Sequence, residues 1–216
     1  EPRNLPTTQK LHVHSFSVSP FRSRNVSRGC GSRRHYPREM ENARVKTVLL
    51  LRHAKSSWDE PGLTDPMRPL APRGRKAAPR VGAYMARNGH IPDRTFCSTA
   101  LRATQTWEMV AAELPRRVPQ EIREDLYHAS PGSLLSLLQE VSDAVETVLL
   151  VGHNPTFEDL ALTLVGTGNG EALADLERKY PTGALCVLDF SVTRWRNLQP
   201  GTGHLREFVR PRTLKS

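Results

Sequence analysis

The sequence predicts a three-layer α/β/α sandwich with a mixed, mostly parallel central sheet, and three observations support this. Continuous apolar runs at residues 47–51 and 147–151 are typical of strands that are covered on both faces. Longer segments between such runs carry apolar residues at helical spacing. Strands that alternate with helices in this way form mainly parallel sheets with helices on both sides.

The expected elements follow one another in a regular order along the chain. Strands are predicted at residues 47–51, 94–98, 147–151, 184–190 and 205–209, with a weaker extended segment at 121–127. Helices are predicted at residues 72–88 and 100–113, from Pro131 onward after a Ser130 N-cap, and from Asn154-Pro155 to Gly166. Pro79 lies inside the first helix and predicts a bend or a late start there. The last two strands are expected to pair through a hairpin-like loop, which makes the sheet mixed.

Basic residues are concentrated near the N-terminus. The chain has 216 residues and a net charge of +9, but residues 1–38 hold eight basic side chains and one acidic one. Residues 39–216 carry 23 basic and 21 acidic groups, which leaves a net charge of +2. This near balance argues against nucleic-acid binding by the folded part, since that function usually shows as a strong excess of basic residues.

Residues 1–43 are expected to form a disordered leader, and residues 44–216 a single domain. The leader is rich in Arg and Ser, poor in acidic residues, and has no sustained apolar period. This composition resembles an organelle transit peptide, which would direct the protein to a chloroplast or a mitochondrion. The alternative is an ordinary extension, or translation from Met40, and predicts a cytoplasmic protein. No apolar run reaches the ~20 residues that a membrane-spanning helix needs.

The three cysteines indicate neither a disulfide framework nor a metal site. Cys30, Cys97 and Cys186 show no paired spacing, and the last two lie within apolar runs as expected for small core residues. No other cluster has the spacing of metal ligands. We therefore predict neither a metal nor another cofactor.

Two segments share one pattern, in which a buried strand ends at a histidine. Residues Val48–His53 are VLLLRH, and residues Val148–His153 are VLLVGH. Because ligands bind beyond the carboxyl ends of strands in open α/β sheets, both histidines are expected to face one pocket. A third strand ends at Ser98 and leads to Arg102 in the first turn of a helix, where free N–H groups favour an anion.

Together these residues predict a phosphate site. Arg52, His53, Arg102 and His153 would form a cationic cup of phosphate size. Guanidinium groups bind phosphate oxygens through a bidentate fork, and a neutral imidazole can attack phosphorus as a covalent nucleophile. Phosphoryl transfer otherwise depends mainly on positioning and electrostatic stabilisation. The combination, rather than any single residue, indicates this chemistry.

Five blocks of sequence resemble the histidine phosphatase superfamily, in the form typical of its SixA-type members. The blocks are Leu51–Trp58 (LRHAKSSW), Asp65–Gly74 (DPMRPLAPRG), Ser98–Thr106 (STALRATQT), Val151–Pro155 (VGHNP) and Tyr180–Ala184 (YPTGA). They occur in the family's order, and the resemblance extends over about residues 46–214. It implies the phosphoglycerate mutase-like fold of that family and a metal-independent phosphatase reaction through a phosphohistidine intermediate.

The resemblance also implies roles for individual residues. His53 matches the nucleophile of the family, while Arg52, Arg102 and His153 match the groups that bind the phosphoryl group. Many relatives use a carboxylate to protonate the leaving group, and Glu124 lies in about the right place. Solvated loop charge is the alternative for Glu124. If its side chain points into the pocket, phosphate esters become plausible substrates.

The expected substrate is phosphohistidine in a protein or a small phosphate ester. The chain leaves little room for the lid insertions with which larger relatives enclose substrates, so we expect an open pocket. The sequence shows no dedicated interface pattern, so a monomer is expected. Ser57 either hydrogen-bonds a phosphate oxygen or shapes its loop, and Trp58, Trp107 and Trp195 are expected to be packing residues. A phosphoglycerate mutase-like phosphotransferase and a non-catalytic phosphate-binding module on the same fold are the alternatives.

Overall fold

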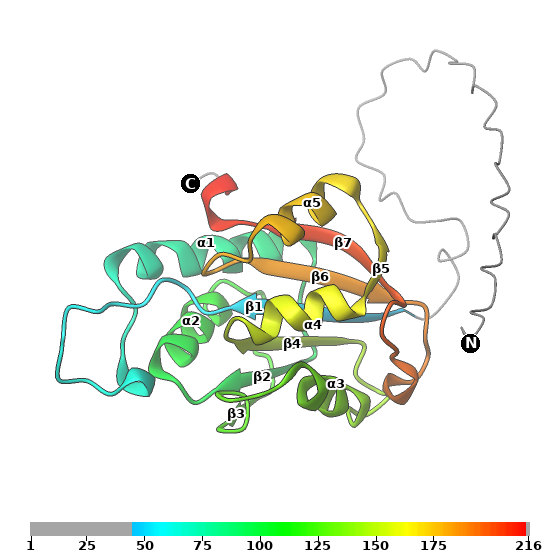
Figure 1. The fold of residues 1–216 in the computed structure, drawn as a ribbon, viewed down its shortest axis with the longest axis horizontal. Coiled ribbons are helices and arrows are strands. Elements are labelled where there is room, and N and C mark those ends of the chain that lie inside the picture. The colour runs from blue at the N-terminus through cyan, green and yellow to red at the C-terminus, as the bar shows by residue number, and fades with distance from the viewer. Residues whose placement is uncertain (1–44, 215–216) are drawn as a thin grey trace, which may run out of the picture. The chain divides into compact units, whose positions relative to one another are not determined.

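The computed structural model describes residues 45–214, which form a seven-stranded sheet with helices on both faces (Figure 1). The leader predicted at residues 1–43 lies outside this range. The strands are β1 (Lys46–Arg52), β2 (Arg94–Ser98), β3 (Gln120–Arg123), β4 (Thr147–Gly152), β5 (Val165–Gly168), β6 (Leu185–Phe190) and β7 (Gly203–Val209). The helices are α1 (Pro72–Asn88), α2 (Leu101–Ala111), α3 (Pro131–Gln139), α4 (Thr156–Leu164) and α5 (Gly170–Arg178). Short 3-10 turns lie at Asp65–Met67, Trp195–Asn197 and Pro211–Thr213.

The strand order is β3-β2-β4-β1-β6-β7-β5, so β4 lies between β2 and β1, although β3 comes before it in sequence. β1 pairs with β4 in parallel, with Leu49 opposite Leu149 and Arg52 opposite Gly152. β6 is antiparallel to both β1 and β7, and it is the one strand of this sheet that runs against the others. The mixed, mostly parallel sheet that the sequence predicts is therefore confirmed, including the antiparallel pairing of β6 and β7.

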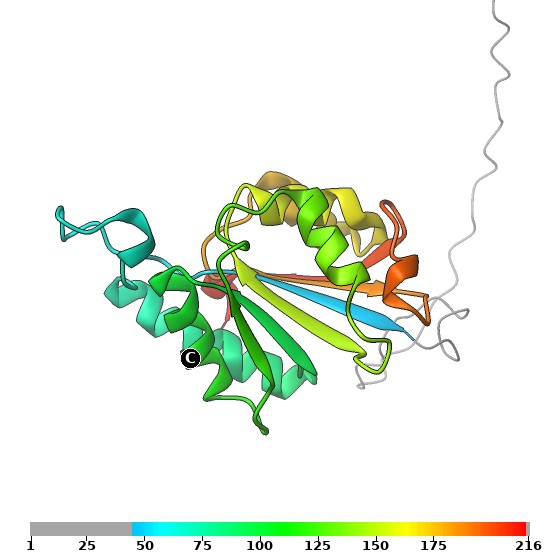
Figure 2. The same ribbon diagram turned by 90° about the horizontal axis from the view of Figure 1, so that it is seen from below.

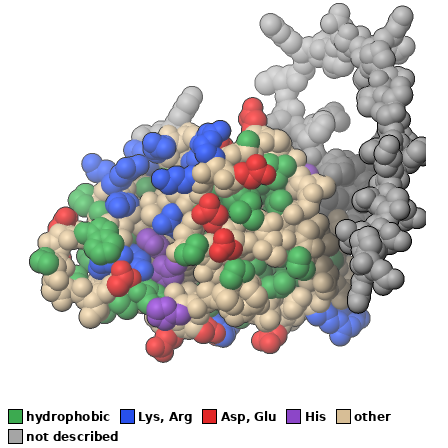
Figure 3. Space-filling model, viewed as in Figure 1, with side chains coloured by type: hydrophobic (Ala, Val, Ile, Leu, Met, Phe, Trp, Pro, Cys, Tyr) green, Lys and Arg blue, Asp and Glu red, His purple; other side chains and the backbone are tan. Residues whose placement is uncertain are grey.

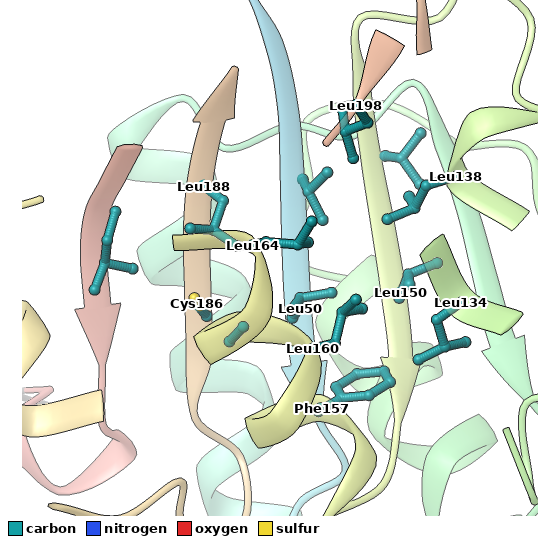
Figure 4. Packing of buried hydrophobic residues seen from close by; sticks show 14 of the residues in the cluster. Leu50, Leu134, Leu138, Leu150, Phe157, Leu160, Leu164, Cys186, Leu188 and Leu198 are labelled. Carbon is teal, nitrogen blue, oxygen red and sulfur yellow. The ribbon is translucent and has the colours of Figure 1, made fainter. Parts of the chain in front are cut away.

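Both faces of the sheet are buried, which explains the continuous apolar runs in the central strands. Leu49 and Leu51 pack with side chains of α1 and α2 on one face, while Val48 and Leu50 pack with side chains of α3, α4 and α5 on the other. Figure 2 shows the helices in two layers, above and below the sheet. Figure 4 shows the second cluster, in which Leu50 lies against Leu160 of α4. Alternating side chains along one strand thus fill two separate cores.

Three details differ from expectation. Helix α1 begins at Pro72 and continues past Pro79 to Asn88, so the predicted late start is wrong. The segment expected to be extended over 121–127 ends as a strand at Arg123, because the chain turns where the Tyr127 N–H donates to the Glu124 carbonyl. The sequence prediction also missed β5 and α5. Within residues 45–214, no helix has the length and apolarity needed to cross a membrane.

Glycines explain why β5 was missed. Gly166 and Gly168 interrupt a strand of four residues and suggest a loop, yet they allow close contact with neighbouring backbone. A Cβ atom on Gly166 would lie 1.9 Å from the carbonyl oxygen of Gly201. Helix α5 then begins after Asn169, whose side chain accepts hydrogen bonds from the N–H groups of Glu171 and Ala172.

Candidate active site

The end of β1 holds Arg52 and His53 in a fixed backbone conformation. The N–H of His53 donates to the carbonyl of Gly152 on β4, and the N–H of Gly183 donates to the carbonyls of both Arg52 and His53. Gly183 has a φ of +77°, a conformation that other residues rarely adopt. The backbone of His53 is therefore held on one side by the end of β4 and on the other by Gly183. Its side chain is buried.

One hydrogen bond fixes the tautomer of His53. Its Nδ1 lies 2.7 Å from the carbonyl oxygen of Ala54, which can only accept, so Nδ1 carries the proton. Nε2 is left with a lone pair. Burial, followed by the nearby charges of His153, Arg102 and Arg52, lowers the pKa of His53 to about 3, although the Ala54 carbonyl opposes this shift. The ring is therefore neutral at neutral pH, with Nε2 available.

Arg102 connects the two histidines. Its Nε donates to Nε2 of His53 at 3.3 Å, and one of its terminal nitrogens lies 3.5 Å from Nδ1 of His153. The guanidinium comes from the first turn of α2, as the sequence predicts, and Arg102 is 5% exposed. The ring centres of His53 and His153 are 5.1 Å apart. The structure thus brings together the two strand-end histidines, 100 residues apart in sequence.

His153 is oriented by Ser98 at the end of β2, the strand next to β4. Its Nε2 lies 2.8 Å from the hydroxyl oxygen of Ser98, the last residue of β2, and that oxygen also accepts from the N–H of Ala100. Burial and the charge of Arg102 lower the pKa of His153 to about 4. Ser98 is the first residue of the STALRATQT block, but the sequence analysis did not predict it as a site residue. Its position at the end of β2 is the signal that could have identified it.

Arg52 lies behind the histidines and is half-buried. One terminal nitrogen donates to the carbonyl of Tyr180 at 2.6 Å, while its Nε is buried and finds no hydrogen-bond acceptor among residues 45–214. Its charge contributes to the lowered pKa values of both His53 and His153. The four predicted residues therefore lie at one end of the sheet, with two arginines beside two neutral histidines.

Comparison with known proteins agrees with this geometry. Residues 48–146 match the histidine phosphatase superfamily, branch 1. The uncharacterized protein Rv1276c of Mycobacterium tuberculosis is 38% identical over 164 residues, which cover 75% of this chain and all of the relative. A solved structure from Agrobacterium tumefaciens, provisionally named phosphohistidine phosphatase SixA, is 31% identical with a TM-score of 0.65 and covers 77% of this chain and 98% of its own.

A plant relative is more distant. An uncharacterized Arabidopsis thaliana protein, At3g52155, described as chloroplastic, is 28% identical over 130 residues, or 56% of this chain and 60% of the relative. The Mycobacterium and Agrobacterium proteins match over nearly their whole lengths. The chain belongs to the histidine phosphatase superfamily, in its SixA-type branch. The fold and the family that the sequence predicts are both confirmed.

In this member of the histidine phosphatase superfamily, a loop carboxylate also enters the site. Asp65 accepts from Arg102 twice, through its carbonyl at 2.7 Å and through its carboxylate at 2.9 Å. The same carboxylate accepts from the Tyr127 hydroxyl and from Arg68. Burial alone would raise its pKa, but hydrogen bonds from Tyr127, Arg68 and Arg102 outweigh that effect and lower the pKa to about 2. Sequence reasoning placed Asp65 in a motif but gave it no role in the site.

The two subsidiary site residues lie on exposed or half-buried loops. Glu124 follows β3, and its side chain is exposed. Ser57 donates its hydroxyl to Asp59 at 2.6 Å and accepts from the backbone N–H of Asp59, so its hydroxyl is held within its own loop. Neither arrangement assigns a role, and the predicted proton donor and phosphate ligand stay predictions.

Two further expectations concern Trp58 and metals. Trp107 and Trp195 are buried, but Trp58 is 70% exposed, so its predicted role as a packing residue is wrong. The guanidinium of Arg68 instead stacks on the Trp58 ring, with the guanidinium carbon 3.5 Å from the ring centre. Such stacking is favourable because a guanidinium is planar and weakly hydrated. In the part of the chain that the structure describes, no three His, Cys, Asp or Glu side chains are grouped as metal ligands.

Proposed function

We propose that the protein is a metal-independent phosphatase that works through a phosphohistidine intermediate on His53. The observation that carries this proposal is the state of the His53 ring. Its proton is on Nδ1 against the Ala54 carbonyl, and the lone pair of Nε2 accepts a hydrogen bond at 3.3 Å from Arg102, a group that binds phosphate oxygens and that a bound phosphoryl group would draw away from Nε2. A neutral imidazole with a directed lone pair next to a guanidinium is suited to attack a bound phosphoryl group.

In the first step, the lone pair of His53 Nε2 forms a bond to phosphorus, and the bond from phosphorus to the leaving group breaks. The leaving group departs with the electron pair of that bond. The His53 ring then carries a proton on Nδ1 and the phosphoryl group on Nε2, so it is positively charged. The Ala54 carbonyl, 2.7 Å from Nδ1, stabilises this charge by accepting the hydrogen bond.

The neighbouring groups would stabilise charge on the three equatorial oxygens. Arg102 supplies its fork, and Arg52 supplies a buried Nε that meets no acceptor among the described residues. His153 can donate from Nδ1 when Ser98 gives its hydroxyl proton to Nε2, at 2.8 Å. Ser98 has that proton available because it accepts, rather than donates, in its bond with the N–H of Ala100.

In the second step, a water molecule attacks phosphorus and the bond from Nε2 to phosphorus breaks. The electron pair returns to Nε2, which restores neutral His53, and dihydrogen phosphate leaves with both hydrogens of the water. The low pKa of His53, about 3, favours this release because the neutral ring is the stable form in the empty site. No metal ion is required at either step.

We propose phosphohistidine in a protein as the substrate, with a small phosphate ester as the second candidate. The provisional name of the Agrobacterium structure supports the first. The pKa of Asp65, about 2, leaves the carboxylate nearest to Arg102 ionised and unable to protonate an alcohol. A substrate imidazole departs as a neutral ring once its other nitrogen is protonated, and therefore needs no such acid. Glu124 would have to supply the proton for an ester.

The phosphoenzyme is the test of this function. The protein is incubated with a labelled phosphoryl donor, quenched in base, and digested. We expect a base-stable, acid-labile phosphate on the peptide that contains His53, no label on His53→Ala, and wild-type labelling of His204→Ala, which changes a histidine on β7 whose Nδ1 contacts Thr167 rather than a site residue. A wild-type protein that hydrolyses neither phosphohistidine nor an ester, or full activity of His53→Ala, would falsify the proposal. Production of 2-phosphoglycerate from 3-phosphoglycerate would favour the mutase alternative.

We also propose that residues 1–43 form a targeting leader. Their Arg- and Ser-rich, acid-poor composition supports this, as does the chloroplastic description of the Arabidopsis relative. Residues 1–43 fused to a fluorescent protein should direct it to chloroplasts or mitochondria in plant cells. A diffuse cytoplasmic signal would contradict the proposal and favour the cytoplasmic alternative.

A further inference from the structure

A strongly basic pocket is lined by Lys55, two residues after His53, and by Pro181, next to Tyr180. Its volume is about 350 Å³, and six of the side chains that line it are basic while none is acidic. These six residues are Lys55, Arg73, Lys76, Arg80, Arg210 and Arg212. We call this cavity the basic pocket. In Figure 3, basic side chains gather near α1 and the C-terminal segment, above the purple histidine atoms.

The charge of the basic pocket is a local excess. Residues 39–216 carry a net charge of only +2, from 23 basic and 21 acidic groups, yet six cations converge on this one cavity. Arg210 is paired with Asp175 at 2.7 Å, and Asp175 does not line the pocket. Like charges that converge on one cavity repel each other, and a bound anion relieves this repulsion.

Helix α1 adds to the positive potential. Arg73, Arg75 and Lys76 occupy its first turns, and no acidic residue is present anywhere in Pro72–Asn88. The N-terminus of a helix is its positive end, where acidic side chains stabilise and basic ones destabilise. Basic residues at the N-terminus of α1 are therefore the opposite of the acidic residues that usually occupy this end of a helix. Departures from such local rules are expected where a binding function requires them.

The walls of the basic pocket are rigid and partly apolar. Pro72, Pro181 and Pro211 line it together with Ala77. The lining segments are packed closely, since a Cβ on Gly74 would lie 2.2 Å from the Lys55 carbonyl and one on Gly183 would lie 2.8 Å from the Pro211 ring. A preformed cavity with an apolar surface and several directed charges is typical of a small-molecule site, and its volume lies in the usual range of roughly 300–1,000 Å³.

We propose that the basic pocket binds a small organic anion with two or more phosphate groups on an apolar body, of the class of a nucleoside diphosphate. The arginines provide forks for the phosphate oxygens, and the prolines contact the apolar body. This ligand is distinct from the phosphoryl group that His53 attacks. The two sites are adjacent, because Lys55 follows His53 by two residues and Pro181 follows Tyr180, whose carbonyl holds Arg52.

The proposal is tested by calorimetric titration of ADP into the full chain without divalent metal. The His53→Ala protein is used so that catalysis cannot consume the probe, which also makes the result independent of the proposed reaction. We expect ADP to bind, adenosine to bind at least tenfold more weakly, and the affinity for ADP to fall as salt is added. Equal affinity for adenosine and ADP would overturn the proposal.

Two double variants of α1 locate the binding. Arg73→Ala/Lys76→Ala removes two charges that line the basic pocket, whereas Arg75→Ala/Arg87→Ala removes two exposed charges of the same helix that do not line it. Both change the net charge equally and leave alanines in the helix. We expect at least tenfold weaker ADP binding in the first and less than a twofold change in the second. Equal affinities in both, or tighter binding of an acidic peptide than of ADP, would contradict the proposal.

Discussion

The Nε of Arg102 lies 3.3 Å from Nε2 of His53, the ring nitrogen that carries the lone pair. One guanidinium therefore points at the atom predicted to attack and remains close enough to meet the oxygens of the attacked group. A single residue both orients the nucleophile and supplies positive charge to the phosphate position.

This relationship predicts that a lysine cannot replace Arg102. Arg102→Lys keeps the charge but loses the planar fork that reaches His53, His153 and Asp65 together. We expect kcat/KM for phosphohistidine to fall on the order of a hundredfold, with little change in thermal unfolding. Steady-state kinetics measure the effect. Arg116→Lys, which alters an exposed pair with Asp93, serves as the control, and a loss of less than threefold in Arg102→Lys would show that the fork is not needed.

The lowered pKa values of His53 and His153 predict a loss of stability in mild acid. Unfolded histidine has a pKa near 6.5, whereas the folded pKa values are about 3 for His53 and about 4 for His153. Below pH 6.5 the unfolded state binds more protons, so the free energy of unfolding falls with decreasing pH until those folded pKa values are reached. The expected slope is about 1.4 kcal/mol per pH unit for each histidine.

Urea unfolding between pH 8 and 5 measures this slope. His53→Asn removes one of the two histidines with a lowered pKa, so its stability should fall less steeply than that of the wild type below pH 6.5. Between pH 7 and 8 the two curves should run parallel, because both histidines are then neutral in both states. Identical slopes below pH 6 would contradict the lowered pKa of His53.

Asp65 predicts competition with phosphate. Its ionised carboxylate occupies the fork of Arg102, so a phosphate that uses that fork must displace it. We expect Asp65→Asn to lower the inhibition constant of inorganic phosphate several-fold, because a neutral amide competes less well for the guanidinium. Glu60→Gln makes the same charge change on an exposed part of the loop and should have no effect. Weaker phosphate inhibition in Asp65→Asn would instead show that the carboxylate positions Arg102 for binding.

Gly74 predicts a packing constraint next to the site. A Cβ there would lie 2.2 Å from the Lys55 carbonyl oxygen, so Gly74→Ala must push α1 away from the segment that follows His53. We expect a loss of about 1–3 kcal/mol in the free energy of unfolding. Gly132→Ala is the matched control in α3, where the nearest atom is 3.9 Å away, and it should be neutral or stabilising. An equal change in the free energy of unfolding for both substitutions would show that the close approach of Gly74 to Lys55 does not limit stability.

Chelators test the metal-independent mechanism. The described residues place no group of three metal ligands together, and the proposed steps use only protein groups and water. EDTA should therefore leave kcat unchanged after extended dialysis. Loss of activity with EDTA, restored by adding back a divalent metal, would overturn the mechanism.

The sequence predicted the parts of the site that depend on strand ends. His53 and His153 follow two apolar strands of nearly the same sequence, and parallel pairing of these strands brings both histidines to one edge. Arg102 could be located because it follows the next strand by a few residues. In each case the position of the backbone fixed the position of the side chain.

The residues that were missed depend on loops or on side-chain direction. Asp65 reaches Arg102 from a loop between β1 and α1, and no periodic pattern determines where such a loop lies. Trp58 carries an aromatic side chain that suggests burial, but its partner is Arg68 rather than the core. The basic pocket joins Lys55 and α1 to the C-terminal Arg210 and Arg212, which are 130 or more positions after the lining residues of α1. Their proximity could be seen only after folding.

The place of β4 between β1 and β2 has a consequence for biosynthesis. His53 and β2, the strand that leads to Arg102, emerge from the ribosome well before Thr147–Gly152, which later fills the gap between β1 and β2. Until that strand is inserted, the two halves of the site have no common wall and His153 is missing. Activity should therefore appear only after the chain extends past His153 and also past Gly183 and β6, which hold Arg52 and His53 from the other side, so turnover of the proposed reaction can serve as a reporter for completion of the central sheet.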